Sequence, residues 1–364
     1  MGPAAWHVQL SRQLSKAGLE PVIDGALSVG EAGLAARHQR HAVERAPALP
    51  PKHVLVLGGT GFIGTEIARA FLRAGSAVTA VARHDPGDWW REELPGAELV
   101  LADAGEACSL APLVNRVDHV VYAVGSIPPQ ESNASPAAAV TDTLPAVLSL
   151  LELLRCCPGT GLTQLSSGGT VYGNPARLPV SESACCEPIT SYGIVKLAVE
   201  KYVGMYATLY GVPARILRVG NAYGPLQPAG RSQGLVSTLL SAARDGTPVR
   251  VFGDGATVRD YVYVGDVAHA AVELARRSDG PRVVNLGTGV GHSVLDVVDI
   301  VSRVTGARSA VEHVPDRGFD VREIVLDVDA LSRLVAWDPL PLEDGIRLTW
   351  QAVRSRTNSI LTVG

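Results

Sequence analysis

The sequence predicts an α/β fold with a doubly wound parallel sheet, followed by a smaller mixed α/β domain. After Lys52, short apolar runs alternate with helical patterns, and this alternation produces right-handed crossovers between parallel strands. A glycine-rich turn follows the first apolar run, where such a sheet places its ligand site. Later in the chain the alternation is less regular. We therefore expect residues 52–220 to form one domain, residues near 256–290 to return to it, and residues 221–364 to form most of a second.

The composition is typical of a protein with a sizeable core. Of the 364 residues, 46% are apolar and 19% are charged, which argues against disorder. The net charge of −4 has no strong sign, so nothing indicates binding to nucleic acid or to an anionic membrane. We find no segment that reaches the length of a membrane span and no signal-peptide pattern. A cytoplasmic protein is expected.

The cysteines do not suggest a metal site. Two adjacent pairs and one lone cysteine lack the intervening residues that usually separate zinc ligands. We expect reduced, apolar side chains, with no metal and no catalytic thiol. The five are Cys108, Cys156, Cys157, Cys185 and Cys186.

Residues 1–51 form an extension with a different texture. The stretch Ser28–Ala48 is helix-like and rich in Ala, Arg and His, and it is followed by a proline-rich linker ending at Pro51. We expect a mobile extension, with a small docking or dimerisation element as the alternative.

A dinucleotide site is predicted after the first strand, His53–Leu57. The sequence GGTGFIG follows this strand directly, and helical periodicity then covers Thr65–Ala74. Glycines allow the backbone to approach a pyrophosphate, and the free N–H groups and dipole of a helix N-terminus favour its charge. This strand–turn–helix context indicates a Rossmann-type domain. The predicted cofactor contacts are Gly58, Thr60, Gly61, Phe62, Ile63 and Gly64.

The second strand, Ala77–Ala82, leaves the choice of cofactor open. An acidic residue at its end would bind the ribose 2′-hydroxyl of NAD, but the chain has Arg83 there and Asp85 only further on. Arg83 suits the 2′-phosphate of NADP, with a solvated loop arginine as the alternative. The expected cofactor is NAD, with NADP possible.

Two further strands line the predicted cofactor path. Glu98–Ala102 ends where the adenine edge would lie, and Val117–Val124 is a buried parallel strand. A long apolar helix at Pro136–Leu154 follows and carries Asp142. The predicted contacts are Asp103, Ala123 and Gly125 with the cofactor and Ser126 with the substrate.

The strand Leu162–Leu165 leads into small and hydroxyl-bearing residues, SSGGTVYG, which suit the floor of a pocket at the carboxyl end of a parallel sheet. Ser167 and Thr170 are the candidate hydroxyls of this segment. The next strand, Ala214–Val219, ends in a second polar turn that contains Asn221.

The helix Ser191–Gly211 carries the candidate catalytic pair. Thr190 or Ser191 can cap its first turn, and Tyr192 and Lys196 lie one turn apart on the same face. A neighbouring ammonium favours the phenolate form of a tyrosine, which can then exchange a proton with a substrate hydroxyl. The spacing alone is common in ordinary amphipathic helices, so its meaning depends on the rest of the chain.

The second half is less regular. Arg259, Arg317 and Asp320 lie in loops beside apolar runs, where solvated charges are the ordinary interpretation. The predicted elements are helices at Gln233–Arg244, Asp266–Arg276 and Val294–Val304 and strands at Val283–Leu286 and Ile324–Leu326.

Six motifs occur in order after Lys52, namely GGTGFIG at 58–64, SSGGTVYG at 166–173, SYGIVK at 191–196, LRVGNAYGP at 217–225, VFGDGATVRDYVYVGDVA at 251–268 and NLGTG at 285–289. With these motifs the chain resembles the extended short-chain dehydrogenase/reductase family. Within that family it is similar to the NAD-dependent nucleotide-sugar epimerase/dehydratase branch, and in particular to UDP-sugar 4-epimerases.

The resemblance implies catalytic roles and an assembly. Tyr192 is the acid/base on the sugar 4-hydroxyl, and Lys196 binds the nicotinamide ribose and assists Tyr192. A homodimer packed through helices near 136–154 and 192–210 is implied as well.

The resemblance also implies how a UDP-linked substrate is bound. Asn221 contacts the substrate phosphates, and Arg259 and Arg317 hold the nucleotide diphosphate, because two guanidinium groups suit paired anions. Asp320 holds the nucleotide ribose. Gln233 completes the predicted substrate contacts.

The chain departs from the family pattern at three places. Gly168 lies where relatives often have Ser or Thr, so Thr170, Ser167 or Ser166 must supply the hydroxyl that helps the proton move, and we favour Thr170. Asp142 replaces a common Asn. Arg83 is the third departure.

The expected activity is C4 epimerisation of a UDP-hexose or UDP-hexuronate through a transient 4-keto sugar. Gly169 and Thr170 stand where dehydrating or decarboxylating relatives usually have an acidic residue, which argues against those activities. The alternatives are a 4,6-dehydratase, a decarboxylase or an NADPH-dependent reductase and, from another class, a non-catalytic dinucleotide sensor.

Overall fold

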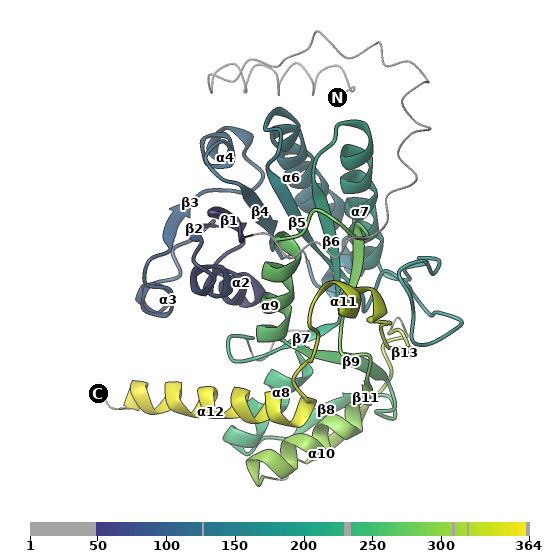
Figure 1. Ribbon diagram of the computed structural model, residues 1–364. Helices are drawn as coiled ribbons and strands as arrows, with labels where there is room; N and C mark the ends of the chain where they lie inside the picture. Colours follow the sequence, from purple (N-terminus) through teal and green to yellow (C-terminus); the bar gives the residue numbers. More distant parts are fainter. Residues whose placement is uncertain (1–48, 126, 229–233, 308–309, 319, 362–364) are drawn as a thin grey trace.

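The computed structural model describes residues 49–125, 127–228, 234–307, 310–318 and 320–361, and within them the predicted doubly wound parallel sheet is confirmed (Figure 1). Its seven strands are all parallel and follow the order β10-β6-β5-β4-β1-β2-β3. The strands are β1 (His53–Leu57), β2 (Ala77–Ala82), β3 (Glu98–Leu101), β4 (His119–Tyr122), β5 (Gly161–Ser167), β6 (Ala214–Val219) and β10 (Val283–Leu286).

Both faces of this sheet are buried, as the continuous apolar runs require. In β1, Leu55 and Leu57 enter the core cluster on one face, and Val54 and Val56 enter the cluster on the other. The first cluster is covered by α4 (Ala107–Val114), α6 (Pro136–Cys156) and α7 (Ser191–Leu209). The second is covered by α2 (Phe62–Arg73), α3 (Asp88–Glu93), α9 (Val264–Ala275) and α11 (Asp329–Leu334).

A smaller mixed region lies at the carboxyl edge of the large sheet (Figure 1). There β9 (Val258–Tyr263) pairs with β7 (Asn221–Tyr223), β11 (Gly291–Ser293) and β13 (Glu323–Ile324). A separate pair joins β8 (Val249–Phe252) to β12 (Val311–Val314). Apolar side chains from these strands pack with α8 (Leu235–Asp245), α10 (Val294–Thr305) and α12 (Leu342–Leu361).

Most predicted elements are present, and four strands (β1, β2, β6 and β10) have the predicted bounds. The helix after the glycine turn begins at Phe62 rather than Thr65, so its first turn includes the last glycine of the motif. Apolar periodicity did not predict the helices α3, α4, α5 (Pro129–Ala134), α11 and α12 or the strands β7, β8, β9, β11 and β12. The short elements among them are too brief to show a clear apolar period. Residues 1–48, and with them most of the predicted extension, lie outside the described residues.

The expectation that no segment reaches the length of a membrane span is wrong for α6. By length and composition this helix of 21 residues could cross a membrane, with a mean hydropathy of 1.5. Its inward side chains, such as Val147, Leu150 and Leu151, pack in the core of the sheet against α4 and α7. Core helices of globular domains pass the same test, and we interpret α6 as one of them.

Candidate active site

The glycine turn between β1 and α2 brings the backbone close to the end of β4. Gly58 has a φ of +77°, and a Cβ added there would lie 2.8 Å from the carbonyl oxygen of Ala123. A Cβ on Gly64 would lie 2.1 Å from the carbonyl oxygen of Gly58. A larger residue at either position would push the turn apart. The motif therefore has a steric basis in this chain.

The N-terminus of α2 is left open by the same turn. Gly61 is the N-cap and offers no side chain to bind the free N–H groups of the first turn. The indole Nε1 of Trp90 donates to the carbonyl of Gly59 at 3.1 Å, and Thr65 Oγ1 donates to the same oxygen at 3.2 Å. These two bonds fix the turn from behind. Free N–H groups, a helix dipole and no intruding side chain fit the pyrophosphate of a dinucleotide.

The end of β2 presents a cation. Arg83 is exposed, and the nearby carboxylate of Asp85 is bound by the Arg91 guanidinium at 2.8 Å and by the N–H of Gly87. The hydrogen bonds from Arg91 and Gly87 lower the pKa of Asp85 below its ordinary value. Asp85 is therefore engaged within its own loop. Asp103, exposed after β3, accepts a hydrogen bond from the N–H of Gly105 at 2.8 Å.

Helix α7 is held at its N-terminus by three separate side chains. Thr190 Oγ1 accepts from the N–H of Gly193 at 3.2 Å, so Thr190 is the cap. Ser132 and Asn133 of α5 accept from the N–H groups of Tyr192 and Ser191, at 3.1 and 2.9 Å. Each bond satisfies a first-turn donor that the helix itself cannot pair. Tyr192 is thus fixed through its own main chain.

The predicted pair, Tyr192 and Lys196, is brought together. Lys196 is buried, and its Nζ lies 5.7 Å from the centroid of the Tyr192 ring. The same Nζ donates to the carbonyl of Leu165 on β5 at 3.5 Å. Tyr192 is half-buried. The structure therefore places a buried amine beside a partly accessible phenol.

The turn after β5 supplies the hydroxyls. A Cβ on Gly168 would lie 2.7 Å from Leu326 Cδ1 and 2.9 Å from the carbonyl oxygen of Arg218, so packing excludes a serine at that position. Thr170 Oγ1 is buried and has no hydrogen-bond partner within the described part of the chain. A Cβ on Gly193 would lie 2.9 Å from the Thr170 carbonyl oxygen, which places this threonine against the first turn of α7.

The remaining two hydroxyls of the turn differ in their availability. Ser166 Oγ donates to Glu200 Oε1 at 2.5 Å and is therefore already bound. Ser167 ends β5 and is half-buried. Asn221 begins β7 beside this turn, since its Oδ1 would lie 3.0 Å from a Cβ on Gly169.

The predicted substrate cations gather at one end of β9. Burial lowers the pKa of Arg259, and the charges of both Asp320 and Arg317 act on it. Arg317 Nε donates to Asp320 Oδ2 at 3.0 Å, and its guanidinium lies 4.2 Å from the centroid of the Phe252 ring. Two guanidinium groups and one carboxylate therefore stand together, although Arg259 is far from the other two along the chain. Partly buried guanidinium groups of this kind favour an anionic partner.

Two predicted substrate residues, Ser126 and Gln233, lie outside the described residues. The sequence analysis also missed side chains that hold the site in place. Trp90, Ser132 and Asn133 carry no local sign of this function, because each acts on a distant segment. Glu200 did carry a sign, since a carboxylate four residues after Lys196 interrupts a buried helix face.

The parallel sheet, the glycine turn at a helix N-terminus and the tyrosine–lysine pair define a class, the extended short-chain dehydrogenase/reductases. The family model described as the NAD dependent epimerase/dehydratase family matches residues 54–287. The UDP-glucose 4-epimerase of Mycolicibacterium smegmatis is 30% identical over 311 residues, which cover 83% of this chain and 99% of that protein. The chain therefore belongs to the NAD dependent epimerase/dehydratase family, and NAD is its cofactor.

Solved structures agree with this assignment. The UDP-glucose 4-epimerase of Thermotoga maritima, solved with UDP-glucose, has a TM-score of 0.79 and 30% identity and covers 84% of this chain and 99% of its own. The UDP-glucose 4-epimerase of Thermus thermophilus, solved with NAD, has a TM-score of 0.77 and 32% identity over 83% of this chain and 99% of its own.

Proposed function

We propose that the chain is a UDP-sugar 4-epimerase that inverts carbon 4 of a UDP-hexose or UDP-hexuronate. The observation that carries this proposal is the junction of α7 with the turn after β5. There Lys196 lies beside Tyr192, and Thr170, whose buried hydroxyl has no partner among the described residues, packs through its main chain against the first turn of α7. The relatives named above are UDP-glucose 4-epimerases and support the UDP-linked substrate.

In this proposal the protein's own groups move the proton. Tyr192 takes the proton of the sugar 4-hydroxyl, and the Lys196 ammonium stabilises the phenolate before and after that transfer. The Thr170 hydroxyl lies between substrate and phenol and passes the proton, since Gly168 cannot supply it. Bound NAD supplies the reversible acceptance of hydride from carbon 4. The 4-keto sugar then turns within the site before it is reduced on its other face.

The far end of the substrate is held by charge. Arg259 and Arg317 bind the diphosphate, and Asp320 binds the nucleotide ribose. Asn221 contacts the phosphates beside the turn after β5. The Arg317–Asp320 ion pair prearranges both side chains. Strong binding at the nucleotide leaves the hexose loosely held, which a sugar must be if it is to turn over.

The loops proposed to contact the cofactor suit NAD, and the charge of Arg83 also suits NADP. The Gly58–Gly64 turn binds the pyrophosphate, Asp103 lies by the adenine, and Ala123 and Gly125 line the path to the nicotinamide. Arg83 is placed to hold a 2′-phosphate. An NADPH-dependent reductase is thus the second candidate function, and Arg83 is the observation that favours it.

A cytoplasmic homodimer completes the proposal. The outer faces of α6 and α7 expose large apolar side chains, and Leu209 is 64% exposed. Such a surface is typical of a protein interface. Leu209→Glu is expected to turn a dimer into a monomer in light scattering, whereas a wild-type chain of monomeric mass would contradict the dimer. The exposed apolar residues are Val140, Ile194, Tyr202, Met205 and Leu209.

The test of the activity is an assay without added nicotinamide. The purified protein is incubated with UDP-glucose, UDP-glucuronate and UDP-N-acetylglucosamine, and the products are examined for the C4 epimer. Epimer formation without added cofactor is expected. Stoichiometric consumption of NADPH would indicate a reductase instead, and intact nucleotide binding without any turnover would indicate a sensor.

A further inference from the structure

A second charged residue of α7 lies next to the catalytic lysine. Glu200 follows Lys196 by four residues, so both side chains leave the same helix face, and both are buried. They reach neighbouring residues of β5, because Lys196 Nζ donates to the carbonyl of Leu165 and Ser166 Oγ donates to Glu200. At this spacing a carboxylate and an ammonium ordinarily pair. Here, although both residues are described, they form no ion pair.

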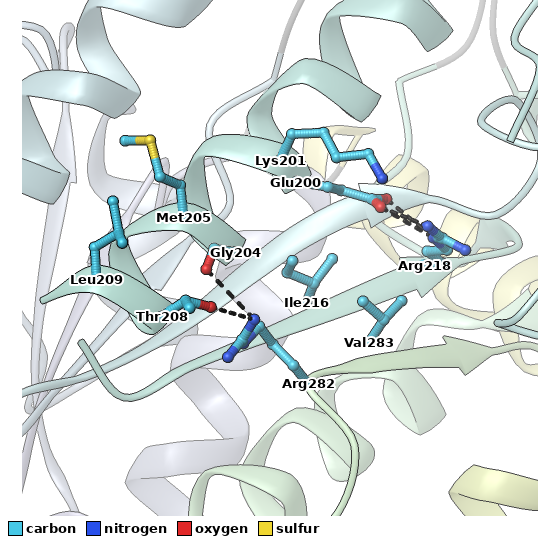
Figure 2. Close-up of a pocket in the computed structure, with 10 residues that line it drawn as sticks. All are labelled: Glu200, Lys201, Gly204, Met205, Thr208, Leu209, Ile216, Arg218, Arg282 and Val283. Atoms are coloured by element: carbon cyan, nitrogen blue, oxygen red, sulfur yellow. Dashed lines mark hydrogen bonds and ion pairs between the residues drawn. The ribbon is translucent and has the colours of Figure 1, made fainter. Parts of the chain in front are cut away.

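Arg218 of β6 explains why this pair does not form. Its Nε donates to both carboxylate oxygens of Glu200 at 3.1 Å, and its Nη2 donates to Oε2 at 2.7 Å (Figure 2). The two side chains are only 5% and 3% exposed. Burial opposes the charge, but the hydrogen bonds with Glu200 raise the pKa of Arg218 above its ordinary value. Together with Ser166, the guanidinium occupies the carboxylate fully.

Other charged and titratable groups also surround this pair. The Glu182 carboxylate accepts the N–H of Asn285 at 2.9 Å, and the Glu182 carbonyl accepts from Arg218. The phenol of Tyr172, whose ring lies 4.7 Å from the Arg218 guanidinium, donates to Asn285. The Cys186 thiol, whose pKa burial raises, and Lys201 also stand near Arg218 and Glu200.

Figure 2 shows that the pair lies at one end of a hollow of about 510 Å³ between α7 and the strands β6 and β10. Arg282 also lines the hollow, where it donates to the carbonyl of Gly204 and to Thr208 Oγ1 (Figure 2). The hollow lies on the side of α7 that carries Glu200. The Glu200–Arg218 pair therefore lines this hollow.

We propose that Arg218 is a positioning residue that acts through Glu200. By binding both carboxylate oxygens, Arg218 prevents Glu200 from pairing with Lys196 and leaves the ammonium directed at Tyr192. Without the guanidinium, the buried carboxylate is free to pair with Lys196, which lies one turn earlier on the same helix face. The phenolate of Tyr192 then loses its counter-charge. This inference rests on the proposed roles of Tyr192 and Lys196.

The test compares two variants across the pH profile of epimerisation. Arg218→Gln is expected to lower kcat about tenfold at neutral pH and to move the acidic limb of the kcat profile to higher pH, with KM changed less than about twofold. Glu200→Gln combined with Arg218→Gln removes both charges, and it is expected to restore kcat and the limb to wild-type values. The double variant also removes an unpaired buried charge, so the melting temperature is measured beside the kcat profile. Recovery of the limb, which a change of stability alone does not move, separates charge from structure.

Arg215→Gln is the matched control. Arg215 lies three residues away on β6, and its guanidinium binds the main-chain carbonyls of Arg277, Asp279 and Pro281. Its loss removes a buried guanidinium without freeing a carboxylate beside Lys196. The control is expected to lower the melting temperature and to leave the pH limb unchanged.

A second variant covers the case in which Arg218→Gln does not fold. Arg218→Lys keeps the cation but loses the forked contact, and it is expected to move the limb in the same direction by a smaller amount. The inference is overturned if a folded Arg218→Gln or Arg218→Lys keeps the wild-type limb, or if the double variant folds and remains slow. Lys196→Met separates the two proposals, because full turnover in that variant would refute the role of Lys196 itself.

Discussion

The pyrophosphate and the nicotinamide of the bound dinucleotide would meet very different parts of this protein. The pyrophosphate turn is built from one continuous stretch, Gly58–Gly64. A Cβ on Gly58 would clash with Ala123 at the end of β4, and one on Gly64 would clash with Gly58 within the turn. The other region, which we call the catalytic wall, consists of α7, the turn after β5 and the end of β6. Buried polar contacts join these three segments. Segments as distant as Tyr172 and Asn285 are hydrogen-bonded there, at 2.6 Å.

The difference shows how each region holds its geometry. The turn depends on shape, so a single methyl group is enough to disturb it. The wall depends on charges and hydrogen bonds, so its function responds to pH and to isosteric changes that leave the shape intact. Variants of the two regions are therefore expected to fail in different ways, one in cofactor retention and the other in turnover.

Tyr192→Phe is expected to have the largest effect on the wall. It removes the acid/base hydroxyl and keeps the ring, so turnover should fall by roughly a thousandfold or more. UDP-sugar affinity, measured by calorimetry, should stay within a few-fold of wild type, because the nucleotide is held at Arg259 and Arg317. A near-normal rate would remove Tyr192 from the mechanism.

Gly64→Ala is the corresponding test of the turn. The new Cβ would lie 2.1 Å from the Gly58 carbonyl oxygen, so the protein is expected to lose its copurifying NAD while the sheet still folds. Absorbance and fluorescence of the purified protein report the retained nucleotide. Gly204→Ala in α7, where the nearest atom to the new Cβ is 3.7 Å away, is the control and should keep NAD. Full NAD retention by Gly64→Ala would show that the turn tolerates a side chain.

Thr170→Val should separate activity from stability within the wall. The buried Oγ1 has no partner in the described residues, so its removal is expected to raise the free energy of unfolding by about 1 kcal/mol. Turnover should fall roughly tenfold to a hundredfold, because the proton relay is lost. Denaturant unfolding and the epimer assay measure the two effects. Thr170→Ser keeps the hydroxyl and should keep the rate; equal rates in Thr170→Val would assign the relay elsewhere.

His119 tests the core at the amino end of β4. Burial lowers its pKa from 6.5 to about 4, with the Arg215 charge adding to that shift. The unfolded chain therefore binds a proton at a higher pH than the folded one. The stability that neutral His119 contributes is fully present above about pH 6.5 and is lost as the pH falls towards 4, by about 3 kcal/mol.

His119→Gln should flatten this part of the stability curve, because glutamine can still bond Thr163 but does not titrate. In wild type, His119 Nε2 lies 2.8 Å from Thr163 Oγ1. The measurement is denaturant unfolding between pH 7 and 4. Identical slopes for the two proteins would contradict a buried neutral histidine.

Arg83→Ala is expected to have the smallest effect on the native activity. If Arg83 holds a 2′-phosphate, the variant should weaken NADP binding by roughly tenfold and NAD binding hardly at all. Titration of the two nucleotides into cofactor-free protein measures the ratio. Equal weakening of both would assign Arg83 to the loop alone.

The sequence predicted the parts of this molecule that depend on neighbours along the chain. The glycine turn, the strands of the large sheet and the Tyr192–Lys196 pair all follow local periods or fixed spacings. The proximity of Arg259 to Arg317 and Asp320 could be predicted only from the family resemblance. It depends on the pairing of β9 with β13, which no local sequence pattern reveals.

The side chains that could not be predicted act across the fold. Trp90 fixes the glycine turn from a helix about thirty residues later, and Ser132 caps a helix that begins far downstream. The exclusion of a hydroxyl at Gly168 depends on Leu326, which no local pattern reveals. Such contacts exist only once the sheet has brought the segments together.

The most direct test of the account follows one hydrogen atom. UDP-glucose carrying deuterium at carbon 4 is converted in ordinary water by the purified protein, without added nicotinamide, and the product is examined by mass spectrometry. If Tyr192 moves only the hydroxyl proton while the hydrogen on carbon 4 leaves and returns as hydride, the epimer keeps its deuterium. An epimer that has exchanged this deuterium for solvent hydrogen would contradict the account.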